Sequence, residues 1–304
     1  MKNTIKFAAL GACALAATST AALAGSESLP GLSTGVALGA PLPEGVYDIS
    51  IFTPASRPST GAAASPSPTV GNNLAVAVPV WLIWSTPWQI AGGRIILDAT
   101  VPWADVEGAG NPDSFLNPIL DAQIKWNFGN GWNAGFHAGA WLPSEQTIPA
   151  ALGRDYTAFQ GIAAISYLKN GWNLSATFIY GSGGDSEKFL GTQTQQAAWF
   201  NYEFTATKKF GKMEIGAIAY GSEDLSNSGL LVCELAGVSH VCKQSQFALG
   251  GLVGYDFGSF EAQFKLSQDV AETNYITAGH NGEETRAWLN IIKPLWHPEA
   301  ESLK

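Results

Sequence analysis

The sequence predicts an all-β protein, a transmembrane antiparallel up-and-down β-barrel of about 12 strands. Three observations lead to this fold class. Charged residues make up 13% of the 304 residues, roughly half of the ~25% that is typical of a soluble domain. Short runs alternate between apolar and small polar residues, as side chains on the two faces of a strand do. The connections between these runs are short and long in turn, which an up-and-down membrane barrel requires.

The first 24 residues have the features of a secretory signal peptide. Lys2 and Lys6 precede an apolar segment, Phe7 to Ala17, and residues 22–24 form a small-x-small cleavage site. We therefore expect export to a bacterial outer membrane. Removing the segment changes the net charge from −9 to about −11, because two lysines are lost with it. Such an acidic chain is not expected to bind nucleic acid.

The remaining chain divides into a lead-in, a barrel and a tail. Residues 25–45 contain several prolines and are predicted to form an irregular lead-in that could plug the lumen. Residues 46–296 are predicted to form the barrel, and residues 297–304 a polar tail. The longest apolar run, Leu74–Trp84, contains Pro79 and falls short of the ~18–20 residues that a spanning helix needs.

Twelve strands are expected, of which the first has the weakest pattern. Short turns are expected after every second strand, and long polar loops after the others, so that the turns face the periplasm and the loops face outside. The turns are predicted at 85–92, 129–131, 169–171, 210–212 and 258–259. The strands are predicted at 46–53, 74–84, 93–102, 118–128 and 132–142, three times within 157–210, and at 213–220, 246–257, 260–267 and 286–295.

Aromatic residues gather near both ends of the predicted strands, as in the two interfacial girdles of a membrane barrel. Trp141 and Trp199 are in addition candidates for inward contacts with a solute. The girdle candidates near the short turns are Trp126, Trp132, Trp172, Phe210, Phe257 and Trp296, and those near the long loops are Trp141, Tyr180, Trp199, Tyr220 and Trp288.

The charged residues of the strands indicate which face of the sheet is in contact with water. An Arg or Lys that faces lipid at the membrane midplane costs about 2–4 kcal/mol. Turning the charged positions inward avoids this cost and turns the aromatic positions toward lipid. A polar lumen is therefore expected, and its candidate residues are Asp98, Asp121, Lys125, His137, Glu203, Glu261 and Lys265.

Two cysteines remain after the signal peptide, Cys233 and Cys242, both within one polar segment. In an exported protein this pattern favours a loop disulfide, which stabilises by about 2–3 kcal/mol if it is unstrained. A metal site is the weaker alternative, because only His240 lies near. No dinucleotide, metal or haem signature is found, so no cofactor is expected.

Several segments resemble a known family. Asn111-Pro112-Asp113 leads to Asn117-Pro118-Ile119, and Leu142-Pro143-Ser144 leads to residues 152–156. Together with Tyr167–Ser175 and Val253–Gly258 they follow the order seen in bacterial outer-membrane proteins of the "MetA-pathway of phenol degradation" family. The resemblance covers most of the mature chain. It implies a β-barrel associated with the uptake of aromatic or other hydrophobic compounds.

Three functions remain open at this point. The leading hypothesis is a passive outer-membrane channel for small hydrophobic or aromatic molecules, in contact with lipid and with no catalytic activity. The second is a surface-binding or structural barrel whose loops meet a partner. The third is an outer-membrane lipid hydrolase, disfavoured because no Gly-x-Ser-x-Gly occurs and His137 has no serine of matching parity on its own strand.

Overall fold

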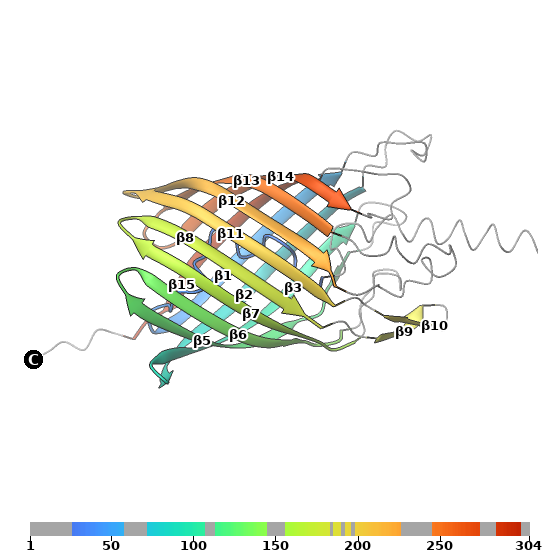
Figure 1. Cartoon of the computed structure of the whole chain (residues 1–304), viewed down its shortest axis with the longest axis horizontal. Helices are drawn as coiled ribbons and strands as arrows, with labels where there is room; N and C mark the ends of the chain where they lie inside the picture. Colours follow the sequence, from blue (N-terminus) through green and yellow to red (C-terminus); the bar gives the residue numbers. More distant parts are fainter. Residues whose placement is uncertain are drawn as a thin grey trace, which may run out of the picture.

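Twelve antiparallel strands close into a barrel. The structure is a computed structural model, and it describes residues 26–57, 72–106, 113–144, 156–182, 185–189, 192–195, 198–225, 245–273 and 284–298. Every strand of the ring pairs with the neighbour before and after it, and the first pairs with the last, so no edge is left open. Figure 1 shows the tilted strands from the side. The predicted fold class is confirmed.

The strands of the ring are, in chain order, β1 (Gly45–Arg57), β2 (Asn72–Ile90), β3 (Gly93–Val106), β5 (Ile119–Gly129), β6 (Trp132–Trp141), β7 (Ala158–Lys169), β8 (Trp172–Gly181), β11 (Trp199–Phe210), β12 (Met213–Asp224), β13 (Ser245–Asp256), β14 (Glu261–Thr273) and β15 (Thr285–Trp296). A three-residue strand, β4 (Asp113–Phe115), pairs with β3 outside the ring. A separate hairpin consists of β9 (Asp185–Phe189) and β10 (Thr192–Gln195).

Short turns join alternate pairs of strands at one end of the barrel (Figure 1). Three of these turns use successive residues with positive φ that end on a glycine: Ala91-Gly92, Gly129-Asn130-Gly131 and Asn170-Gly171. Two left-handed residues in a row match the twist of the strands that they join, and asparagine and glycine reach this conformation at low cost. The local sequence thus fixes the register of these hairpins.

The turn predicted at 85–92 is wrong, because β2 continues to Ile90 and only Ala91-Gly92 form the turn. Serine, threonine and proline after Trp84 suggested a loop. In the structure the Ser85 side chain is buried, and its hydroxyl donates to the carbonyl of Leu42 at 2.9 Å. A polar residue with a buried acceptor has no need of solvent, so the strand does not end there.

The weakly patterned first strand is longer than predicted and completes the ring. β1 pairs with β15 on one side and with β2 on the other. Its inner face is apolar, with Tyr47, Ile49 and Ile51 buried, whereas the partly buried Asp48 has the outward parity. This strand therefore runs opposite to the pattern of polar residues inside and apolar residues outside, which explains its weak signal.

A β-bulge at Pro79 reverses the parity of β2. Val76 and Val78 are buried before it, Pro79 and Val80 are both exposed, and Trp81 is buried after it. The pairing with β1 and with β3 shifts register at the same place. Proline has no N–H to give to a ladder, so it is accommodated where the ladder is already interrupted.

The outer surface of the barrel is apolar. The largest exposed side chains of the strands are aliphatic or aromatic, an arrangement that only a lipid environment makes favourable over so wide an area. Within the described residues no helix is long and apolar enough to cross a membrane. Outward side chains near mid-strand include Leu82, Phe136, Phe178, Phe204, Leu249, Phe264 and Leu289.

Candidate functional site in the barrel lumen

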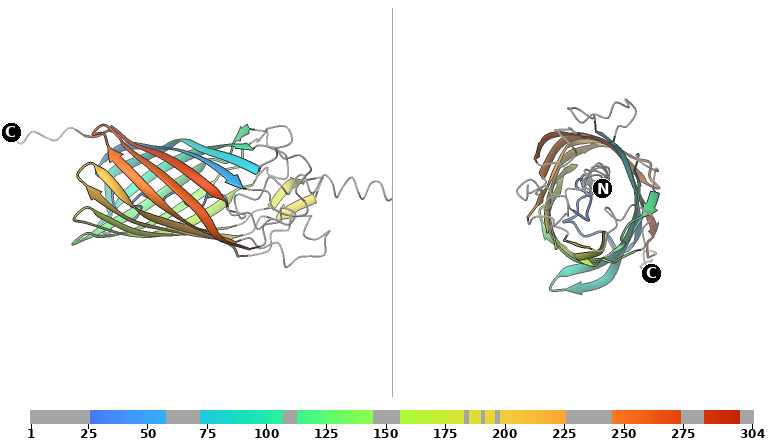
Figure 2. Two further views of the ribbon diagram at one scale, coloured as in Figure 1. Left: turned by 90° about the horizontal axis from the view of Figure 1, so that it is seen from above. Right: turned by 90° about the vertical axis from the view of Figure 1, so that its right-hand side faces the viewer.

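The chain that precedes β1, residues 26–44, lies inside the ring of strands, as the end-on view of Figure 2 shows. It is built from tight turns. The amide of Leu32 donates to the carbonyl of Leu29 at 3.2 Å. Gly31 and Gly35 have φ of 89° and 88°. These left-handed conformations favour glycine, so the two glycines allow the segment to fold back on itself within the lumen.

Two charged side chains of the wall hold this luminal segment. The carboxylate of Glu203, on β11, accepts hydrogen bonds from the Gly31 amide at 2.8 Å and from the Ser33 amide at 2.9 Å. The Ser33 hydroxyl also donates to it, at 2.6 Å. On β14 the Lys265 ammonium donates to the carbonyl and the hydroxyl of Thr34, both at 2.9 Å. Buried charges are thus satisfied by the backbone of the segment.

Uncharged wall residues add further contacts to the luminal segment. The Gly35 amide donates to the Thr205 hydroxyl at 2.8 Å. The Gly39 amide donates to the Ser166 hydroxyl at 3.1 Å. The side-chain amide of Asn201 donates to the carbonyl of Ser28 at 2.8 Å. The segment is therefore hydrogen-bonded to β7 and β11 along most of its length.

The opposite wall is apolar, which corrects the expectation of a polar lumen. The inner faces of β1, β2 and β3 contribute a buried apolar cluster that also includes Leu29 and Leu38 of the luminal segment. Leu32, Val36 and Leu42 pack against it. Because the segment covers these residues, an apolar inner face is compatible with a membrane barrel. Ala164, Tyr220, Ala248 and Trp288 join the cluster from β7, β12, β13 and β15. On β1 to β3 its wall residues are Tyr47, Ile49, Ile51, Val76, Val78, Trp81, Ile83, Ile96 and Ala104.

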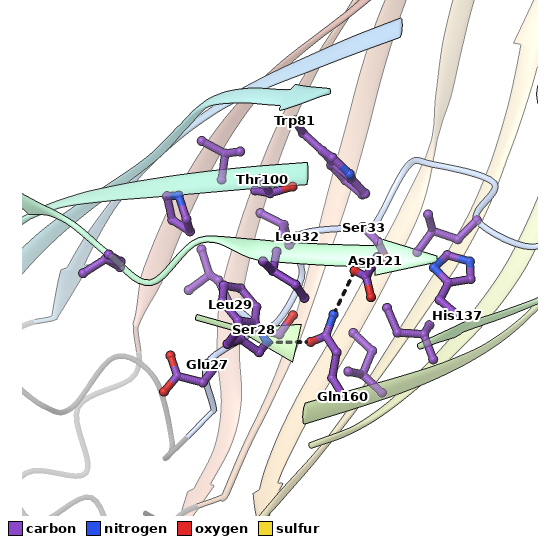
Figure 3. Close-up of a pocket in the computed structure, with 18 of the residues that line it drawn as sticks. Glu27, Ser28, Leu29, Leu32, Ser33, Trp81, Thr100, Asp121, His137 and Gln160 are labelled. Carbon is purple, nitrogen blue, oxygen red and sulfur yellow. Dashed lines mark hydrogen bonds between the residues drawn. The ribbon is translucent and has the colours of Figure 1, made fainter. Parts of the chain in front are cut away.

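A cavity of about 60 Å³ lies between the luminal segment and the wall. Its surface is mostly apolar, with Leu29 and Leu32 on the segment side and Val78, Ile162 and Ile179 on the wall side. Figure 3 shows the side chains of Asp121, His137 and Gln160 reaching the same space. The cavity is therefore apolar with a few polar groups at one side, which is the usual composition of a small-molecule binding site.

A chain of hydrogen bonds organises the polar side of the cavity. The Trp141 indole N–H donates to Gln160 Oε1 at 3.0 Å, and Gln160 Nε2 donates to Asp121 Oδ2 at 3.3 Å, as the dashed lines in Figure 3 indicate. Asp121 itself lies over Gly139, where a Cβ atom would overlap its carboxylate. The chain thus spans β5, β6 and β7 and fixes each side chain.

His137 is buried beside this chain, with 1% of its surface exposed. Leu38 of the luminal segment lines the same cavity as His137. The Nε2 atom of His137 has no partner among the described residues. The ring therefore presents one unsatisfied nitrogen to the lumen side of β6.

The structure places the seven predicted lumen residues in three groups. Asp98, Asp121 and Lys125 lie near His137 on β3, β5 and β6, where Asp98 pairs across strands with Asp121 and accepts a hydrogen bond from Gln123. Glu203 and Lys265 hold the luminal segment. Glu261 lies at the short-turn end of β14 and forms an ion pair with Lys209, at 2.5 Å, away from the other two groups.

Four of the predicted girdle residues do not face lipid. Trp141, Trp199, Tyr220 and Trp288 are 4%, 0%, 1% and 1% exposed. Trp141 and Trp199 belong to one buried cluster, and Tyr220 and Trp288 to another, where their rings are in contact. The Lys265 ammonium lies 4.4 Å from the centre of the Trp288 ring. Trp141 and Trp199 have the inward orientation that the sequence also suggested for them. For Tyr220 and Trp288 the prediction used position along the strand and neglected parity, which decides the face.

The other girdle candidates lie at the surface. Trp126 is partly buried, and its indole N–H donates to the carbonyl of Ala91 at 3.1 Å. The exposed ones are Trp132, Trp172, Tyr180, Phe210, Phe257 and Trp296. Phe178, Phe200, Tyr202 and Phe247 form ring contacts on the outer face. Their alternation with buried residues along the strand is the sequence feature that indicates their outward orientation.

Other site residues escaped the sequence reasoning, and other predictions are untested. Trp81 lines the cavity but has the inward parity only because of the bulge. Gln160 could have been found, since it alternates with the exposed Phe159. Cys233, Cys242 and the proposed signal peptide lie outside the described residues, so the disulfide and the export segment stay predictions.

A closed antiparallel ring with an apolar exterior and a filled interior defines a transmembrane β-barrel of the outer-membrane type. The chain matches the "MetA-pathway of phenol degradation" family over residues 55–282 and belongs to that family. The family suggested by the sequence segments is thereby confirmed.

Of three similar solved structures, one has a TM-score above 0.5 and agrees on the fold. The COG4313 outer membrane channel from Pseudomonas putida F1 is 14% identical, with a TM-score of 0.66, over 84% of this chain and 97% of that chain. The NanC porin is 10% identical, with a TM-score of 0.47, over 81% of this chain and 100% of that chain. The CymD monoaromatic hydrocarbon channel is 9% identical, with a TM-score of 0.45, over 84% and 90%. A search of curated proteins found no match.

Proposed function

We propose that this chain is a passive channel of the bacterial outer membrane for small hydrophobic or aromatic molecules. The observation that carries the proposal is the apolar cavity between the luminal segment and the wall. A channel for sugars or ions needs a continuous wet path, whereas this lumen is occupied by a segment with an apolar side. Family membership and the channel likeness support the same conclusion.

The luminal segment affects the route that a solute can take through the barrel. Because residues 26–44 fill part of the ring, a solute would pass either when the segment moves or sideways through the wall. Hydrogen bonds to Glu203 and Lys265 hold the segment in place, and such bonds can break and form again. A gated or lateral route therefore fits better than a permanently open pore.

No catalytic step forms part of the proposal. A hydrolase would need a nucleophile in reach of a base. The Nε2 atom of His137 has no hydroxyl partner among the described residues.

The experiment compares uptake of radiolabelled toluene by bacterial cells that express the chain with uptake by cells that do not. The variant Ile162→Phe places a larger side chain in the cavity, and we expect uptake several-fold slower than with the parent chain. The matched control is Ile165→Phe on the same strand, because Ile165 is exposed on the outer face. Equal uptake with and without the chain would refute the proposal.

A further inference from the structure

A basic and aromatic cluster lies on the outer face of the barrel, at the short-turn end of β7, β8 and β11. Trp172 pairs across the strands with Lys169 on one side and with Lys208 on the other. The Lys208 ammonium lies 4.9 Å from the centre of the Trp172 ring and 5.5 Å from the centre of the Phe210 ring. Attraction to the rings holds the ammonium there, while the lysine stem covers apolar surface. We call Lys169, Trp172 and Lys208 the basic cluster.

The two lysines of the basic cluster form no ion pair among the described residues. The acidic residues at the short-turn ends of β12, β13 and β14 are Glu214, Asp256 and Glu261. They share the parity of buried residues in their strands and therefore belong to the inner face. Two outward cations without a carboxylate partner are complementary to a phosphate group.

A groove on the outer face begins beside the basic cluster. Its volume is about 390 Å³, within the range of small-molecule sites, and its lining residues come from β7, β8, β11, β12 and β13. Ala206 of the groove lies two residues from Lys208 on β11 with the same outward parity, so about 7 Å of strand separates the two Cα atoms. Larger side chains, Leu174 and Phe204, border the small ones. The small lining residues are Ala176, Ala206, Ala217 and Ala219.

The groove and the basic cluster call for different chemistry in one molecule. The groove lies on the face that meets lipid, where van der Waals packing, not exclusion of water, favours one occupant over another. A hydrocarbon chain in a concave groove contacts more atoms than a chain on a convex wall. A second copy of the barrel would fill the groove with side chains but would bring no phosphate to the lysines. A molecule with both an acyl chain and a phosphate satisfies the two features together.

We propose that the basic cluster and the groove form a binding site for one anionic phospholipid. Its phosphate contacts Lys169 and Lys208, and one of its acyl chains lies in the groove past Ala206. Since the short turns of such barrels face the periplasm, the lipid belongs to the periplasmic leaflet. The inference goes beyond the proposed function, because the site lies outside the barrel and involves neither the lumen nor a transported solute.

The test measures lipid binding to the folded chain in detergent by native mass spectrometry. Phosphatidylglycerol and phosphatidylethanolamine with identical acyl chains are titrated separately, because their headgroups differ in net charge. We expect one phosphatidylglycerol molecule to bind several-fold more tightly than phosphatidylethanolamine. Lys208→Gln should weaken phosphatidylglycerol binding about fivefold, and the double variant with Lys169→Gln about 25-fold. Phosphatidylethanolamine binding should change by less than about twofold.

The matched control for the charge is Lys293→Gln. Lys293 is also an exposed lysine of outward parity at the short-turn end of the barrel, but it lies on β15 and pairs across strands with Asp48. This variant should bind phosphatidylglycerol as the parent chain does. An equal loss in Lys293→Gln, or a parent chain that does not prefer phosphatidylglycerol, would overturn the proposal.

A second set of variants tests the groove. Ala206→Phe places a ring in it, and we expect several-fold weaker binding of both lipids, with the preference for phosphatidylglycerol retained. Ala217→Phe should act in the same way. Ala163→Phe is the control, since Ala163 is exposed on the outer face of β7 but does not line the groove. Faster migration of unboiled protein on a gel shows that each variant is folded.

Two results would assign the surface to another occupant and refute the proposal. If inorganic phosphate displaced phosphatidylglycerol while Ala206→Phe bound it normally, the lysines would form a site for free phosphate alone. If the parent chain formed a dimer that Ala206→Phe abolished, the groove would belong to an interface between two copies.

Discussion

Glycines on the inner face determine where the large luminal side chains fit. A Cβ atom at Gly181 would overlap the indole of Trp199 on the neighbouring strand, and Trp199 is fully buried. Gly139 makes room for Asp121 in the same way. These glycines are required by close approach, since neither has a positive φ. Small residues on the inner face thus shape the lumen as much as the aromatic residues do.

We predict that Gly181→Ala destabilises the barrel by about 1–3 kcal/mol, because the added methyl group forces Trp199 out of its position. Chemical denaturation in detergent, followed by tryptophan fluorescence, measures the change. Gly161→Ala is the control, since a Cβ atom there meets nothing closer than 3.9 Å. An equal loss of stability in both variants would show that strand propensity, not the Trp199 contact, is responsible.

The luminal segment depends on a single carboxylate for three of its hydrogen bonds. Glu203 accepts from the Gly31 amide, the Ser33 amide and the Ser33 hydroxyl. Each hydrogen bond to a charged group contributes about 1.5–3 kcal/mol. Glu203 is therefore the wall residue whose loss removes most hydrogen bonds around Gly31 and Ser33.

We predict that Glu203→Ala releases the luminal segment and increases the permeability of the barrel to small sugars. The measurement is the swelling rate of liposomes that contain the protein, which we expect to rise several-fold over the parent chain. Glu261→Ala is the control, because Glu261 pairs with Lys209 near the short turns and, among the described residues, forms no direct hydrogen bond with the segment. Unchanged swelling for Glu203→Ala would mean that the remaining hydrogen bonds and the apolar contacts are enough to hold the segment.

The register of β2 depends on the extra residue at its bulge. Val76 and Val78 face inward before Pro79, and Trp81 and Ile83 face inward after it. A shift by one residue moves every side chain of a strand segment to the other face. The bulge thus lets one strand keep apolar residues on the inner wall along its whole length.

We predict that deletion of Pro79 prevents folding, whereas Pro79→Ala leaves the barrel intact. The deletion would turn either the residues before the bulge or those after it to the wrong face. A gel that compares boiled and unboiled protein separates the two outcomes, since only the folded barrel migrates faster when unboiled. A folded deletion variant would show that β2 can rebuild its register elsewhere.

The same element shows where sequence reasoning ends. The alternation of apolar and polar residues located most strands and placed Glu203 and Lys265 on inward positions. This was possible because a period of two residues can be recognised within a short stretch of sequence. The alternation could not assign Trp81, whose face depends on a bulge, or the apolar wall of β1 to β3, whose partner is a segment without periodicity. The contacts of residues 26–44 are tertiary, so no local pattern of that segment announces them.

On the scale of the whole molecule, the barrel has two apolar surfaces with different partners. The outer surface meets lipid, and the inner wall of β1 to β3 meets the luminal segment. The polar wall lies on the other side of the lumen and holds the backbone of the same segment. The segment therefore has an apolar side and a polar side, which face the apolar and the polar wall of the lumen. This complementarity explains why an irregular chain adopts one position.

The outward apolar surface gives the last prediction. Leu249 lies near the middle of β13 and is exposed on the outer face, and Tyr255 is exposed near the short-turn end of the same strand. In a lipid bilayer an arginine at mid-depth costs about 2–4 kcal/mol, and near the interface about 0–1. We therefore expect Leu249→Arg to lower the unfolding free energy by the larger amount and Tyr255→Arg by the smaller.

The measurement is urea unfolding of the protein folded in lipid vesicles, followed by tryptophan fluorescence. Leu249→Ala separates the loss of the leucine from the addition of charge. If β13 faced water instead, both arginines would be tolerated equally and Leu249→Ala would cost as much as Leu249→Arg. A depth-dependent difference requires lipid on this face, because only a bilayer makes the same charge more costly at the centre of a strand than at its end.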